Sequence, residues 1–173
     1  MLRIRRDLPS GLLDCAPREV AEVLDGPTLI HLPGRAGRPL FVSMLLHGNE
    51  FTGLLAMQRI LNYYQERTLP RPLWLFVGNV AAAGAGKRAL TGQPDYNRIW
   101  GSGDSPEHAM AREVLERVAP SQPVACIDIH NNTGRNPMYT VVARRDASHL
   151  SLASRFARTV VYATSPDTTC SAA

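Results

Sequence analysis

Two histidines in this sequence each follow a run of apolar residues, and a glutamate lies three positions after the first of them. The two segments read LLHGNE (45–50) and CIDIHN (126–131). Two imidazoles and one carboxylate are a known catalytic zinc set that leaves a fourth position open for water. Zinc lowers the pKa of such a water to roughly 7, so hydroxide is available at neutral pH. We therefore predict a site for one Zn²⁺ per chain, with His47, Glu50 and His130 as its ligands.

The second histidine is what makes this prediction specific. An HxxE motif alone arises often by chance, and ordinary histidines at strand ends are the alternative interpretation. A histidine after a separate apolar strand favours a metal site, because ligands gather at the carboxyl ends of strands in α/β sheets. Asp128 lies two residues before His130 and therefore faces the same side of its strand. Two interpretations stay open for Asp128: a partner that orients His130, or a structural carboxylate.

A further polar cluster, DYNR at 95–98, lies between the two metal-binding segments. The guanidinium of Arg98 is a planar fork that fits a carboxylate with two hydrogen bonds. The neighbouring Asn97 adds directional hydrogen bonds. A surface turn is the alternative interpretation, and it would be preferred if the metal residues were not there.

The elements that must position these residues alternate between strands and helices. Apolar runs predict strands, 3.6-residue periodicity predicts helices, and Gly- and Ala-rich sequence predicts a long loop over 78–105. The alternation indicates an α/β fold, with a mostly parallel or mixed sheet flanked by helices. Strands are expected at 27–32, 40–46, 73–77, 124–129 and 138–143, and helices at 50–67, 106–118 and 148–161, the last of them running into a strand near 160–163.

Composition limits the classes of protein that this chain can represent. Its 173 residues, 45% of them apolar, suit one globular domain, which we assign to 1–173. The net charge of +4 comes from scattered basic residues, which argues against nucleic acid and fits a small anionic substrate. No signal peptide and no apolar run of about 18 residues is seen, so we expect no membrane partner and a cytoplasmic location. A homo-oligomer is compatible with the sequence. Three widely spaced cysteines indicate neither a disulfide framework nor a CxxC metal site.

Four short motifs together resemble the succinylglutamate desuccinylase/aspartoacylase family, whose fold is similar to that of the zinc carboxypeptidases. They are HGNE at 47–50, GN at 78–79, DYNR at 95–98 and DIHNNTG at 128–134, in the family's order. The resemblance implies a zinc-dependent amidohydrolase that cleaves the amide bond of an N-acyl amino acid.

The same resemblance implies a role for individual residues. His47, Glu50 and His130 match the zinc ligands, and Asn97 with Arg98 matches the pair that holds the substrate carboxylate. Arg88 matches the arginine that polarises the scissile carbonyl. Asn131 follows the second histidine as in aspartoacylase-like members, and we place it with the substrate-binding residues.

One feature departs from the family pattern. The family's general-base glutamate follows a later strand, but no glutamate follows Glu116 in this sequence. We therefore expect this chain to be the N-terminal portion of a longer catalytic domain, or a truncated product. Two alternatives to the deacylase stay open: a metallocarboxypeptidase of the same superfamily, and an inactive zinc-binding fragment or pseudoenzyme.

Overall fold

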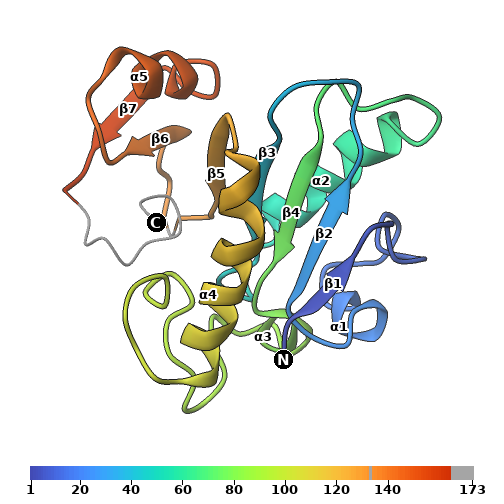
Figure 1. Ribbon diagram of the computed structural model, residues 1–173. Coiled ribbons are helices and arrows are strands. Elements are labelled where there is room, and N and C mark those ends of the chain that lie inside the picture. Colours follow the sequence, from blue (N-terminus) through green and yellow to red (C-terminus); the bar gives the residue numbers. More distant parts are fainter. Residues whose placement is uncertain (133, 165–173) are drawn as a thin grey trace.

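The computed structural model describes residues 1–132 and 134–164, and its main feature is a five-stranded sheet with helices on both faces (Figure 1). In spatial order the strands are β1 (Arg3–Arg5), β2 (Thr28–Leu32), β4 (Leu73–Val77), β3 (Leu40–Met44) and β5 (Ala125–Ile129). The helices around it are α1 (Val20–Val23), α2 (Thr52–Tyr63), α3 (Val80–Gly84) and α4 (Pro106–Val118), followed by a 3-10 turn at Ala119–Ser121.

The strands of this sheet are mixed in direction. β2 and β4 run antiparallel, whereas β1 with β2, β3 with β4, and β3 with β5 run parallel. The α/β class with a mixed sheet flanked by helices is therefore confirmed. Because Met44 pairs with Ile129 at the ends of β3 and β5, the residues that follow these two strands emerge at the same edge of the sheet.

Alternating side chains of the strands supply two separate hydrophobic cores. On β3, Val42 and Met44 pack with α1, α2 and α3, whereas Phe41 faces the opposite core, which contains α4. Tyr96, Ile99 and Trp100 join the α4 side, so the segment between α3 and α4 is anchored by buried rings. The site described below rests on a sheet that is covered on both faces.

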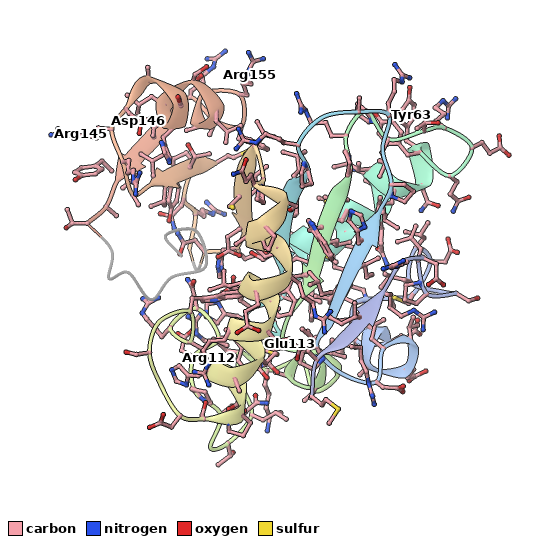
Figure 2. The ribbon with its side chains drawn as sticks, viewed as in Figure 1. Tyr63, Arg112, Glu113, Arg145, Asp146 and Arg155 are labelled. Atoms are coloured by element: carbon pink, nitrogen blue, oxygen red, sulfur yellow. The ribbon has the colours of Figure 1, made fainter. Side chains whose placement is uncertain are left out.

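The last described elements form a small unit beside β5 (Figure 1). β6 (Tyr139–Val142) pairs in parallel with β7 (Thr159–Tyr162), and α5 (Ala147–Ala153) connects them. The carboxylate of Asp146 caps α5 by accepting a hydrogen bond from the backbone N–H of His149, and Figure 2 shows Asp146 with Arg145 and Arg155 around this unit. Among the described residues, no helix is long and apolar enough to cross a membrane.

The structure corrects several expected boundaries. The segment 78–105 is not all loop, because α3 forms at Val80–Gly84 with the side chain of Asn79 accepting from the N–H of Ala82. Its alanines carry too little apolar surface to show a helical period. The helix expected at 148–161 ends at Ala153, and β7 starts at Thr159. The short elements β1 and α1 were not expected, since three or four residues are too few for a periodic pattern.

A tight turn after β3 aims the first histidine segment. Leu45 is fully buried and has a φ of 55°, a left-handed conformation that bulky residues adopt rarely. The segment after β4 fixes this turn, because the N–H of Gly78 donates to Met44 (3.0 Å) and that of Asn79 donates to Leu45 (2.7 Å). The GN motif thus has a structural role: it holds the backbone that leads into His47.

Gly48 lies where the HGNE segment crosses α3. A Cβ at this position would lie 2.3 Å from the carbonyl carbon of Ala82 and from the backbone nitrogen of Ala83. Since both contacts are backbone atoms, they cannot move aside as a flexible side chain could. Glycine is therefore required for α3 to pack against the metal-binding segment.

We expect Gly48→Ala to lower the free energy of unfolding by about 2–3 kcal/mol or more, because the added methyl group overpacks the contact with α3. Gly92→Ala is the matched control: Gly92 has a φ of +84° but no atom within 4 Å of its Cβ position. Only the backbone cost of about 1–2 kcal/mol applies there. Denaturant unfolding followed by circular dichroism measures both, and equal losses for the two variants would contradict the packing argument.

Candidate metal centre

His47, Glu50 and His130 come together at the carboxyl-terminal edge of β3 and β5. His47 follows the turn after β3, Glu50 lies just before α2, and His130 is the first residue after β5. The Nδ1 atom of His47 lies 2.9 Å from Glu50 Oε1, and that of His130 lies 2.8 Å from Glu50 Oε2. One potential ligand atom from each residue lies within 4.8 Å of the other two. The three residues that the sequence nominates as ligands are thus brought to one point.

The buried Nδ1 atom of His47 indicates that a cation fits between His47, Glu50 and His130. It lies close to Glu50, yet it makes no hydrogen bond with acceptable geometry. A buried polar atom without a partner is costly, so such an atom needs an explanation. A metal ion between His47, Glu50 and His130 would provide one, and the donor set of two imidazoles and a carboxylate is one that zinc accepts.

Each histidine is held from behind by a carboxylate. The Nε2 atom of His47 lies 2.8 Å from Asp95 Oδ1, and the Nε2 atom of His130 lies 2.6 Å from Asp128 Oδ2. In both rings Nε2 therefore faces an outer carboxylate and Nδ1 faces Glu50, so Nδ1 is the nitrogen that a metal bound between these residues would take. This pairing of an imidazole with an outer carboxylate is usual for metal-binding histidines, because it fixes the ring and its tautomer. Of the two interpretations open for Asp128, the contact favours the partner that orients His130.

The charges around the site favour a divalent cation. Glu50, Asp95 and Asp128 contribute three negative charges, and Arg88 contributes one positive charge. With both imidazoles neutral, as metal binding requires, the local charge is therefore −2. Arg88 donates to Glu50 Oε1 (3.0 Å) and to Asp95 Oδ2 (3.3 Å). It therefore links one nominated ligand, Glu50, to the carboxylate that contacts another, His47.

The pKa values of the site residues follow from the same arrangement. Burial opposes ionisation of Glu50, but hydrogen bonds from His130 and the backbone of Asn131, together with the close imidazole of His47, hold its pKa well below the usual range. Burial also opposes protonation of His130, but its contacts with Asp128 and Glu50 raise its pKa to about 10. The site therefore stabilises positive charge at this position, which is the property that a metal site needs.

Asn131 lies between the metal centre and the start of α2. Its backbone N–H donates to Glu50 Oε2 (2.9 Å). Its side chain accepts from the N–H of Thr52 (3.2 Å) and donates to the hydroxyl of Thr52 (2.7 Å). In this structure Asn131 positions Glu50 and caps α2, and its contact with substrate stays a prediction.

The DYNR segment is joined to the metal centre through Asp95. The N–H of Asn97 donates to Asp95 Oδ1 (2.8 Å), which is the oxygen that faces His47. Tyr96 is buried in the α4 core, where burial raises its pKa to about 12 and Glu107 adds to the shift. Arg98 is exposed and donates to the carbonyl of Asn97, so it lies at the surface beside the centre rather than against its ligands.

Comparison with known proteins adds the family to this geometry. Residues 36–172 match the model of the succinylglutamate desuccinylase/aspartoacylase catalytic domain. The chain belongs to this family. Its members are typically hydrolases and generally depend on zinc. Searches of curated proteins and of solved structures returned no match.

Two residues of this family member's site were not assigned a role from sequence. Asp95 is the first residue of the DYNR motif, but its position in the sequence does not show that its carboxylate contacts His47. Ser43, which donates to Asp128 Oδ1 (2.6 Å), lies within the apolar run LFVSMLL at 40–46. A lone hydroxyl in a buried strand is the signal that could have identified it.

We expect the purified chain to bind about one zinc ion, and His47→Ala and His130→Ala each to lose most of it, because each removes one of three protein ligands. His149→Ala is the matched control, since His149 is exposed and pairs with Asp146 outside the site. Elemental analysis after gel filtration measures the zinc content. Full zinc content in both ligand variants would show that the metal lies elsewhere.

Proposed function

We propose that this chain is a zinc-dependent amidohydrolase domain acting on the amide bond of an N-acyl amino acid. The observation that carries the proposal is the buried Nδ1 of His47, which has no hydrogen-bond partner and faces Glu50 and His130 in a chain of the deacylase family. Zinc bound there would act as a Lewis acid on the amide carbonyl and lower the pKa of water to roughly 7.

The residues around the ligands keep this site in one arrangement. Asp95 and Asp128 lie against the Nε2 atoms of the two histidines, so that both Nδ1 atoms point inward at Glu50, where a bound metal would replace any proton on them. The N–H of Asn131 orients Glu50. Such preorganisation favours catalysis, because groups that are already in place need not be reoriented during the reaction.

Arg88 is the residue that we propose to contact the scissile carbonyl oxygen. Its guanidinium uses two of its nitrogens on Glu50 and Asp95, and more than half of its side chain is exposed at 56%. Arginine has five N–H donors, so donors remain for a substrate oxygen. The positive charge beside the ligands would stabilise negative charge that develops on that oxygen.

Asn97 and Arg98 are the residues that we propose for the substrate carboxylate. The side-chain oxygen of Asn97 is buried and makes no hydrogen bond. A buried polar atom without a partner needs an explanation, and a hydrogen bond from a bound substrate would provide one. The exposed guanidinium of Arg98, adjacent in the chain, can add charge-assisted hydrogen bonds.

Hydrolysis also needs a group that accepts a proton from the attacking water, and the contacts of the carboxylates at the centre show which of them could do so. Glu50 uses Oε1 on His47 and Arg88 and Oε2 on His130 and Asn131. Within residues 1–132 and 134–164, Asp95 and Asp128 are likewise engaged with histidines. The described carboxylates at the centre therefore hold it together, and none is free to accept a proton.

We accordingly expect the zinc-loaded 173-residue polypeptide to bind N-acyl amino acids but to hydrolyse them slowly. A positioned general base contributes about 10²–10⁴-fold to such reactions, and the described site does not offer one. Release of free amino acid, with and without a chelator, measures the rate. Rapid, chelator-sensitive turnover by this polypeptide would contradict the expectation. Glu107, Glu113 or an Asp128 released from His130 would then be the candidate bases.

Arg98→Ala should weaken binding of an N-acyl amino acid to the zinc-loaded chain by roughly tenfold or more, and Arg98→Lys by less, because lysine lacks the planar fork. The analogue with its carboxylate converted to an amide should bind poorly and should be indifferent to both changes. Arg155→Ala is the control, since it removes the same charge beside α5 (Figure 2). Titration calorimetry gives the affinities. Equal losses for the acid and the amide would remove Arg98 as the carboxylate anchor.

A further inference from the structure

A buried serine lies next to the carboxylate behind His130. Ser43 on β3 and Asp128 on β5 are paired residues of neighbouring parallel strands, so their side chains lie on the same face of the sheet. The Ser43 hydroxyl donates to Asp128 Oδ1 at 2.6 Å, and Asp128 Oδ2 lies 2.6 Å from Nε2 of His130. The contacts form a chain from one strand to the next and on to a nominated metal ligand.

The setting of this chain of contacts is unusual for a purely structural hydroxyl. Ser43 is 0% exposed, and its neighbours along β3 are apolar. Burying a hydroxyl or a carboxylate costs free energy unless each is hydrogen-bonded. An apolar pair at these two positions would avoid that cost, so the polar pair has a reason other than packing.

We propose that Ser43 is a positioning residue for the metal site, which acts through Asp128 on His130; this inference rests on the proposed zinc-dependent function. The hydroxyl fixes the rotation of the Asp128 carboxylate, so that its second oxygen is directed at Nε2 of His130. That oxygen in turn fixes the ring and directs Nδ1 at Glu50 and the metal. Ser43 is not one of the nominated ligands.

The other histidine is supported differently, which explains why a second hydroxyl is not needed there. Asp95, which holds His47, is 37% exposed on its side chain and is itself oriented by Arg88 and by the N–H of Asn97. Asp128 is only 8% exposed on its side chain. Water can replace a lost partner at the more exposed carboxylate more easily than at the buried one.

The test compares zinc affinity in four purified proteins: the wild-type chain, Ser43→Ala, Ser43→Thr and Thr28→Val. Removal of an outer partner of a metal ligand, here Asp128, typically costs about 10- to 100-fold in metal affinity. Ser43 acts one step further out, so we expect Ser43→Ala to weaken zinc binding by up to about tenfold, the lower end of that range. Ser43→Thr keeps the hydroxyl and should restore most of the affinity. Competition with a chromophoric chelator measures the zinc dissociation constants.

Thr28→Val is the matched control for loss of a buried hydroxyl. Thr28 on β2 is 1% exposed and donates to the carbonyl of Gly26 at 2.8 Å. β2 carries none of the nominated ligands and is separated from β3 by β4. We expect this variant to lose stability but to bind zinc as the wild type does. The absorption spectrum of bound Co²⁺ is the second readout, and it should change in Ser43→Ala and not in Thr28→Val.

The outcomes separate this inference from the proposed function. Wild-type zinc affinity in Ser43→Ala, or an equal loss of affinity in Thr28→Val, would overturn the positioning role. If Ser43→Ala does not fold, Asp128→Asn decides: it retains the shape but not the charge, and unchanged zinc affinity and Co²⁺ spectrum would overturn the inference. Failure of the wild-type chain itself to bind zinc would instead contradict the proposed function.

Discussion

The parallel pairing of β3 with β5 is the constraint on which the metal centre depends. Met44 and Ile129 lie side by side at the carboxyl ends of these strands, so the chain leaves both strands at one edge of the sheet. His47 and His130 follow within three residues of these strand ends. A shift of the register by one residue would turn both Asp128 and His130 to the other face of the sheet and separate them from Ser43, His47 and Glu50. The packing of both cores against this sheet therefore fixes the ligand geometry as well as the fold.

The same edge of the sheet gathers charge that the protein would not collect for stability alone. Three carboxylates surround two histidines, and two of them, Asp128 and Glu50, raise the pKa of His130 to about 10. Nearby like charges and desolvation both oppose such a cluster. Arg88 offsets one negative charge, and a divalent cation, which would displace the proton of His130, would offset the remaining two. In this account the buried cluster exists because it holds a metal, and the buried Nδ1 of His47 without a hydrogen bond is its most specific sign.

Sequence patterns predicted those features that depend on burial and strand ends. The apolar runs before His47 and His130 place both histidines at the correct edge, and the order of the motifs indicates the family. Contacts between distant segments were less accessible. Nothing in the DYNR motif shows that Asp95 reaches His47, because that contact depends on the path of the segment between α3 and α4, which buried Tyr96, Ile99 and Trp100 anchor. The Ser43–Asp128 pair depends on strand register, which a single sequence does not specify. The helix α3 was missed because its alanines show no periodicity.

X-ray absorption at the zinc K-edge of the zinc-loaded chain tests the central claim most directly, because it reports the atoms around the metal. The account predicts two imidazole nitrogens at about 2.0–2.1 Å, oxygen ligands at about 2.0–2.2 Å, and no sulfur. The multiple-scattering signal of two imidazoles should identify both histidines. A sulfur shell at about 2.3 Å would assign the metal to a cysteine instead, and a spectrum with fewer than two imidazoles would contradict a centre built from His47, Glu50 and His130.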